Sequence, residues 1–151
     1  MAVKANHDIS SGLDTAFINS AINSNLAYRP EFVSNDYTQG KKVSVAIERE
    51  LRHCDAFYIS VAFITEGGLA PLKQVLAELR DKGIPGKILT TSYLTFTEPK
   101  ALKTLADLSN VEVRVYDSTD EGASGFHTKG YIFKEEEIYR FIVGSSNMTA
   151  S

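Results

Sequence analysis

Apolar positions in this chain recur at two spacings, which predict alternating helices and strands between residues 42 and 116. Val43, Ile47 and Leu51 are four residues apart, which is the spacing of one helix face. Residues 56–64 are almost entirely apolar and rich in β-branched and aromatic side chains, which is typical of a strand buried on both faces. The same alternation continues further along the chain. We therefore predict a largely parallel sheet over this region.

The later elements follow from the same two periodicities. Apolar residues at helical spacing over 69–79 predict a second helix, and a strand is predicted over 87–94. Thr97 is expected to cap a third helix formed by the residues that follow it. Residues 111–116 alternate apolar and polar side chains, so we predict a third strand with one more polar face.

Two further strand-like runs follow at 126–133 and 138–146, separated by a short charged link. So short a link favours an antiparallel hairpin at one side of the sheet. The predicted fold class is therefore α/β, with a mixed, largely parallel sheet flanked by helices and ending in an antiparallel hairpin.

Residues 1–40 differ in composition, being rich in Asn, Ser and Asp. We predict an N-terminal arm, or a helix followed by a loop, preceding a domain over 41–151. Its apolar side chains are expected to pack on that domain or on a partner chain. The chain stops at Ser151, after a run that resembles the start of a helix, so we expect the domain to be truncated at its C-terminus.

Composition narrows the possible functions. The net charge of −3 and pI of about 5.6 argue against a strongly basic, tail-driven nucleic-acid binder, although they allow a local basic groove. The single cysteine, Cys54, excludes an internal disulfide framework and a cysteine-based zinc site. The sequence has neither a membrane-spanning run nor a signal-peptide pattern, so we expect a cytoplasmic protein with no membrane partner.

The side chains best suited to chemistry lie between residues 126 and 151. His127 and Lys129 are two residues apart, so on a strand both would project from the same face. The neighbouring strand is followed by residues 144–147, Gly-Ser-Ser-Asn, and the hairpin would bring Asn147 and a serine hydroxyl close to the histidine. A phosphate group would find there a cation, neutral donors and a candidate nucleophile.

Each of these residues also has an ordinary structural interpretation. An isolated histidine is usually a plain strand residue, and Gly-Ser-Ser-Asn is a common strand-to-helix turn with a capping side chain. We interpret other polar groups as structural or solvated, namely His7, His53, Cys54, Thr90, Thr91 and residues 135–137. Three residues are kept as candidate substrate-binding groups at the edge of the site, namely Ser146, Glu66 and Ser92.

The pattern His127-Thr128-Lys129 followed by Gly144-Ser145-Ser146-Asn147 resembles the H-x-K and G-S-x-N signature of the phospholipase D superfamily. The resemblance implies a phospholipase D-like fold and a histidine that attacks phosphorus to form a phosphohistidine. It implies that His127 is nucleophile or general acid and that Lys129 and Asn147 bind phosphate oxygens. Ser145 would make a further contact to phosphate or histidine. No metal or cofactor is expected.

The sequence departs from the family pattern in two respects. The aspartate that often lies five residues after the lysine is replaced by Lys134, with Glu135 the nearest acidic residue. Only one motif is present, whereas the reaction needs two histidines, so the resemblance implies a homodimer with two copies of His127 facing each other. An acidic residue expected after the second strand would lie beyond Ser151, which leaves the activity of the fragment itself open.

Within the superfamily, the sequence is similar to modules at the N-terminus of bacterial helicases and in metal-independent restriction endonucleases. This implies a DNA phosphodiesterase with helicase or motor domains C-terminal to it. One alternative is a phosphate-binding, DNA-targeting module without catalytic turnover. Another is a lipid-directed phospholipase, for which the sequence offers no membrane-seeking stretch.

Overall fold

The structure is a computed structural model that describes residues 31, 33–36, 38, 41–117 and 126–150. The chain divides into two compact units, residues 1–42 and 43–151. In the described part of the first unit, Asp36 and Lys41 form an antiparallel bridge. Most of the predicted arm over 1–40 lies outside the described residues, and the prediction for it is not tested.

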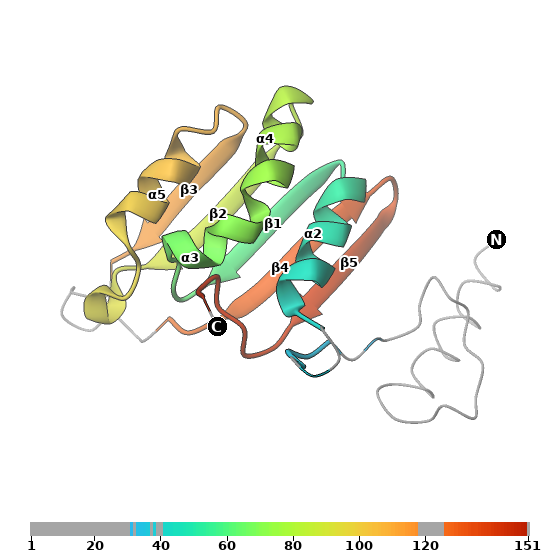
Figure 1. The fold of residues 1–151 in the computed structure, drawn as a ribbon. Coiled ribbons are helices and arrows are strands. Elements are labelled where there is room, and N and C mark those ends of the chain that lie inside the picture. The colour runs from blue at the N-terminus through green and yellow to red at the C-terminus, as the bar shows by residue number, and fades with distance from the viewer. Residues whose placement is uncertain (1–30, 32, 37, 39–40, 118–125, 151) are drawn as a thin grey trace. The chain divides into compact units, whose positions relative to one another are not determined.

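The described residues of the second unit form a five-stranded mixed sheet in the order β3-β2-β1-β4-β5 (Figure 1). β1 is parallel to β2, and β2 to β3, whereas β4 is antiparallel to β1 and β5 to β4. The strands are β1 (Ala56–Val61), β2 (Gly86–Thr91), β3 (Val111–Tyr116), β4 (Lys129–Glu135) and β5 (Ile138–Val143). The α-helices are α2 (Val43–His53), α3 (Glu66–Leu69), α4 (Lys73–Asp81) and α5 (Pro99–Ala106).

The α/β class, the first helix and the C-terminal hairpin are confirmed. Val43, Ile47 and Leu51 are buried along α2, as their spacing predicts. The hairpin of β4 and β5 lies on one side of the sheet, with β5 at its edge. The predicted mixed sheet is also confirmed, but its two antiparallel pairings make it only partly parallel, where the sequence had predicted a largely parallel one.

All of these helices lie on the same face of the sheet (Figure 1). Two successive crossovers in the same direction, from β1 to β2 and from β2 to β3, place their helices on one side. The core lies between this face and the helices. Its large buried side chains include Ile47, Leu51, Phe57, Ile59, Val75, Leu79, Ile88, Tyr131 and Phe133. A side chain at Gly86 would overlap the Phe57 ring, so the close contact between β1 and β2 requires glycine there.

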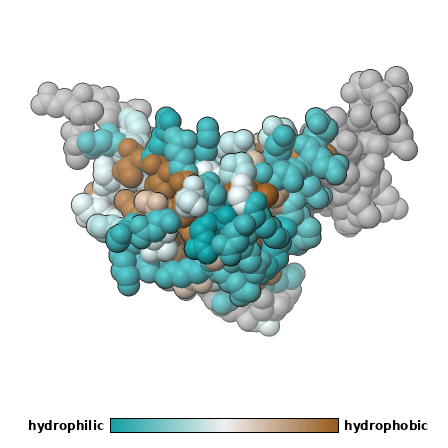
Figure 2. Space-filling model, turned by 90° about the horizontal axis from the view of Figure 1, so that it is seen from above, coloured by the Kyte–Doolittle hydropathy of each residue, from teal (hydrophilic) through white to brown (hydrophobic). Residues whose placement is uncertain are grey.

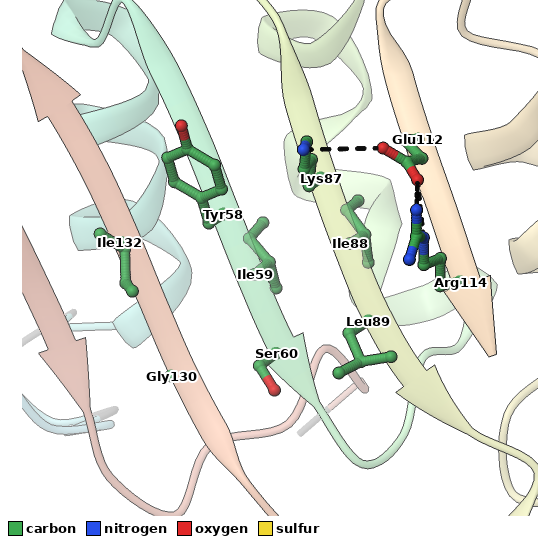
Figure 3. A pocket seen from close by; sticks show the side chains of 10 residues that line it. All are labelled: Tyr58, Ile59, Ser60, Lys87, Ile88, Leu89, Glu112, Arg114, Gly130 and Ile132. Atoms are coloured by element: carbon green, nitrogen blue, oxygen red, sulfur yellow. Dashed lines mark hydrogen bonds and ion pairs between the residues drawn. The ribbon is translucent and has the colours of Figure 1, made fainter. Parts of the chain in front are cut away.

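The opposite face of the sheet carries no helix among the described residues. A shallow depression of about 360 Å³ lies in its middle, where Tyr58, Leu89 and Ile132 meet the ion pair of Glu112 with Arg114 (Figure 3). Seen from above, the described surface is mostly hydrophilic, and hydrophobic residues show in separate patches (Figure 2).

Three local predictions are wrong, each because a tertiary contact or a proline decides the backbone. The strand predicted over 87–94 ends at Thr91, and Tyr93–Thr95 forms a 3-10 turn. Thr97 does not cap α5, since Glu98 is the N-cap and the buried Thr97 hydroxyl donates to the Thr91 carbonyl at 3.1 Å. The helix predicted over 69–79 is interrupted by a 3-10 turn, Ala70–Leu72, which contains a proline.

Candidate active site

The two halves of the H-x-K and G-S-x-N pattern meet at the edge where the parallel strands end. Lys129, the first residue of β4, pairs with Val61, the last residue of β1. Gly130 pairs with Val143, the last residue of β5. The segments that precede β4 and follow β5 therefore lie at the same edge of the sheet, below the arrowhead of β1 (Figure 1). In open α/β sheets, this edge is where ligands usually bind.

His127 and Lys129 are in contact, as their spacing predicts. The Lys129 Nζ lies 2.8 Å from Nδ1 and 3.2 Å from Nε2 of His127, and it also donates to the His127 carbonyl oxygen at 3.1 Å. His127 itself precedes β4 rather than belonging to it. Its side chain is exposed, whereas Lys129 is only 9% exposed. The imidazole is thus accessible to a ligand, and the Lys129 ammonium contacts it from the buried side.

Thr128 fixes the backbone between these two residues. Its hydroxyl lies 2.6 Å from the Ser60 hydroxyl of β1, on the face of the sheet opposite Lys129. Because neighbouring residues of an extended chain project to opposite sides, this bond holds His127 and Lys129 on the other side together. The sequence analysis did not identify Ser60.

The charge on Lys129 has no acidic neighbour among the residues that the structure describes. Its contacts are the imidazole and the carbonyl of His127, and no carboxylate among the described residues lies within ion-pair distance of it. Burying an ammonium without a counter-charge is unfavourable, because neither water nor an anion compensates for the lost hydration. An anionic ligand beside His127 would supply the missing charge.

Asn147 is oriented by the main chain that follows β1. Its Oδ1 accepts a hydrogen bond from the Phe63 N–H at 3.2 Å. Since an N–H can only donate, the amide oxygen must face it, and the amide nitrogen remains as the donor for a ligand. The Phe63 ring also contacts His127 edge to face, with centroids 5.8 Å apart. Phe63, which the sequence analysis did not identify, therefore connects the two halves of the site.

The segment that carries Asn147 is held against the start of α3. Met148 is buried and forms a parallel bridge with Ile64. Its N–H donates to the Phe63 carbonyl at 3.1 Å, and its carbonyl accepts from the Thr65 N–H at 2.9 Å. A side chain at Gly68 would overlap the main chain of Met148. Residues 147–150 are therefore not the beginning of a helix, which their composition resembles.

The two serines of the motif are placed differently. Ser145 is exposed, and Ser146 is half-buried. The Ser146 carbonyl accepts a hydrogen bond from the Tyr131 hydroxyl at 3.0 Å. Burial raises the pKa of Tyr131, which keeps this hydroxyl a donor. In the part of the chain that the structure describes, neither serine hydroxyl contacts His127, so their predicted roles depend on a bound ligand.

Glu66 and Ser92 are engaged elsewhere. The Glu66 carboxylate accepts hydrogen bonds from Lys73 of α4 at 2.9 Å and from Thr104 of α5 at 2.7 Å. The bond from Lys73, followed by that from Thr104, lowers the pKa of Glu66. The Ser92 hydroxyl donates to Asp117 at 3.3 Å. The structure gives neither residue a contact with His127. Glu66 instead connects α3, to which it belongs, with α4 and α5.

In the part of the chain that the structure describes, the other nucleophilic or metal-binding candidates do not form a second site. His53 lies exposed at the end of α2, with Nδ1 2.8 Å from the Arg49 carbonyl. Cys54 is buried, and burial raises the pKa of its thiol to about 11, so it stays protonated at neutral pH. Within the described ranges, no group of three or more His, Cys, Asp and Glu side chains is arranged to hold a metal ion. His7 lies outside the described residues.

No family model matches the chain, and neither does any curated protein sequence. Among the helices that the structure describes, none combines the length and apolar character needed to cross a bilayer. The motif and its geometry are therefore the basis on which a function can be proposed.

Proposed function

We propose that the protein is a metal-independent phosphodiesterase of the phospholipase D type that hydrolyses DNA, acting as a homodimer within a larger helicase or restriction-type protein. The observation that carries the proposal is the contact between the buried Lys129 ammonium and the exposed His127 imidazole, with no carboxylate of the described residues beside them. A phosphate diester carries a negative charge that would balance the ammonium, and its oxygen atoms can accept hydrogen bonds from it.

The free site suggests how binding activates the nucleophile. An ammonium can only donate and a neutral imidazole has one nitrogen lone pair, so one of the two ring nitrogens near Lys129 Nζ, Nδ1 at 2.8 Å or Nε2 at 3.2 Å, accepts from it. A phosphate oxygen is a stronger, charge-assisted acceptor, and its arrival would draw the ammonium away from the ring. The freed nitrogen of His127 would then be available to attack phosphorus.

The reaction needs a nucleophile, a second group that transfers protons, and a means to stabilise charge. His127 forms a bond to phosphorus as the bond to the leaving oxygen breaks, and the His127 of a second copy protonates that oxygen. Lys129 and the Asn147 amide nitrogen hold the non-bridging oxygens, where negative charge is concentrated. Water then attacks the phosphohistidine and gives its proton to the second histidine, which returns both imidazoles to their starting states.

Cleavage of single- and double-stranded DNA in EDTA tests this proposal. We expect cleavage by the wild type and none by His127→Ala. His53→Ala is the matched control, because His53 is exposed and lies on α2, outside the site. Cleavage that requires Mg²⁺, or that survives His127→Ala, would contradict the proposed mechanism.

A second candidate is a phosphate-binding module that delivers an attached motor to DNA without cleaving it. It is favoured by the single imidazole of the site, since one described chain offers a cation and an amide for phosphate but no separate general acid. In that case His127→Ala would weaken DNA binding, and neither protein would cleave DNA under any of these conditions.

A further inference from the structure

Large apolar side chains are exposed in the turn that follows β2. Tyr93 is 42% exposed, and Leu94 and Phe96 are each 58% exposed. Contiguous exposed apolar residues on a soluble domain often mark a binding surface, because their contact with water is unfavourable. We refer to Tyr93, Leu94 and Phe96 as the aromatic turn.

The aromatic turn is held in a defined and strained shape. Leu94 and Thr95 have φ angles of 53° and 54°, a conformation that side chains other than glycine rarely adopt. The Tyr93 N–H donates to the Thr91 hydroxyl at 3.1 Å, and the Thr95 N–H donates to the Ser92 carbonyl at 3.1 Å. Strain of this kind is retained where the surrounding contacts enforce it, and it is common at ligand sites.

The aromatic turn continues directly into the candidate site. The Phe96 ring contacts the Phe63 ring edge to face, with centroids 5.1 Å apart. Phe63 in turn contacts His127, with centroids 5.8 Å apart. Two ring contacts thus connect an exposed aromatic side chain to the proposed nucleophile, within reach of the nucleotides that flank a phosphate held at His127.

We infer that Phe96, assisted by Tyr93, stacks on a nucleobase next to the bound phosphate, so that the preferred substrate is single-stranded nucleic acid. The inference rests on the proposed function and adds strand preference to it. Aromatic side chains bind single strands because unpaired bases expose their faces, whereas in a duplex those faces are covered by neighbouring base pairs. The Lys129 ammonium would supply the backbone contact, and Phe96 the contact to the base.

Binding to two strands that differ only in their bases tests this inference. The probes are a short fluorescein-labelled oligothymidylate and an abasic strand of the same length, measured at low salt by stopped-flow fluorescence anisotropy, so that binding is recorded before the proposed activity cleaves the strand. We expect the wild type to bind the thymidylate strand roughly ten-fold more tightly than the abasic strand. Phe96→Ala should abolish this preference, and Phe96→Tyr should retain it.

Two further variants guard against an effect of misfolding. Tyr93→Ala removes a second exposed ring, and it should reduce the preference even if Phe96→Ala fails to fold. Val45→Ala removes an apolar side chain that is 57% exposed on α2, and it should leave both affinities unchanged. Unfolding curves for each variant show whether the fold is retained.

Lys129→Gln separates this inference from the proposed function, because it should weaken the binding of both strands by a similar factor. If that holds and the wild type binds the two strands equally, the stacking inference is wrong and the phosphate site stands. If Lys129→Gln has no effect but the base preference depends on Phe96, the stacking surface stands and the phosphate site is wrong. Failure of the wild type to bind either strand would overturn both.

Discussion

Lys129 holds its charge in surroundings that do not favour a charge in the free protein. The residue is 9% exposed, and within the described part of the chain its ammonium contacts the imidazole and carbonyl of His127 and no carboxylate. A lysine ammonium is strongly hydrated in water, and fully buried lysines are rare unless they are paired. We therefore expect this residue to lower the stability of the free protein in exchange for phosphate binding.

Lys129→Met tests this trade-off. Methionine has a similar length and no charge, so we expect the free energy of unfolding to increase by roughly 0.5–2 kcal/mol. Inorganic phosphate should raise the melting temperature of the wild type, because it binds only the folded state, and should leave the variant unchanged. Thermal unfolding with and without phosphate measures both effects.

Lys134→Met provides the matched control. Lys134 lies on the same strand but on the opposite face of the sheet, so the substitution removes the same charge away from the site. This variant should still respond to phosphate. A decrease in stability for Lys129→Met, or a phosphate response that persists in it, would contradict the interpretation.

Single residues of the site differed in how far the sequence could predict them. His127, Lys129 and Asn147 belong to spaced motifs, and their types have direct chemical meaning. Phe63 stands in an apolar run and is indistinguishable there from a core phenylalanine. Its role arises only because β1 ends at Val61, which frees the Phe63 N–H to bind Asn147. That event depends on a segment 84 residues further along the chain.

At the scale of elements, the position of Asn147 depends on a close contact between two backbones. The start of α3 packs against the main chain of Met148, with Gly68 at the point of contact. The sequence marks this place only as a Gly67-Gly68 break after a strand. The contact of Gly68 with Met148 could not be predicted, because it is the β4–β5 hairpin that brings Met148 to this place.

Gly68→Ala should therefore displace Asn147 and weaken the candidate site, although Gly68 is not itself a site residue. The added methyl group overlaps the Met148 backbone, and overpacking of this kind costs about 1–3 kcal/mol. Because Asn147 directly precedes Met148, we expect phosphate affinity and DNA cleavage to fall at least about ten-fold. Unfolding curves and phosphate titrations on the same preparations measure the two effects.

Gly130→Ala is the control for this substitution. It adds the same methyl group next to Lys129, where a side chain would meet no atom within 4 Å. Its stability and phosphate affinity should match those of the wild type. Equal behaviour of the two alanine variants would show that the contact at Gly68 does not position Asn147.

The elements with regular periodicity were predictable, and β3 has the predicted bounds, whereas the ends of several other elements were not predictable. α2 and β3 follow their apolar patterns closely. The strand predicted over 87–94 failed in its last three residues, although two of them, Tyr93 and Leu94, are large and apolar. The Thr90 hydroxyl donates to the Ala62 carbonyl, just after β1, and the Thr97 hydroxyl donates to the Thr91 carbonyl at the end of β2. These two bonds fix where β2 ends and override the local preference of the residues that follow.

For the whole molecule, the position of the site depends on strand order. β4 pairs with β1 rather than with β3, which directly precedes it in the sequence of strands. This choice places the start of β4 beside the end of β1. The sequence predicts a hairpin at one side of the sheet but not which strand it joins, since parallel and antiparallel neighbours both accept a strand with buried side chains.

The proposed dimer makes the last prediction, which concerns two molecules. Because the site described here presents a single imidazole, the mechanism requires the His127 of two chains at one phosphate. Wild-type and His127→Ala chains are refolded together at constant total concentration. They should form mixed dimers in which one of the two His127 side chains is missing. DNA cleavage should then fall with the square of the wild-type fraction, to about one quarter in an equal mixture. A linear fall, to about one half, would indicate that each chain acts alone, and mixing with His53→Ala should cause no loss at all.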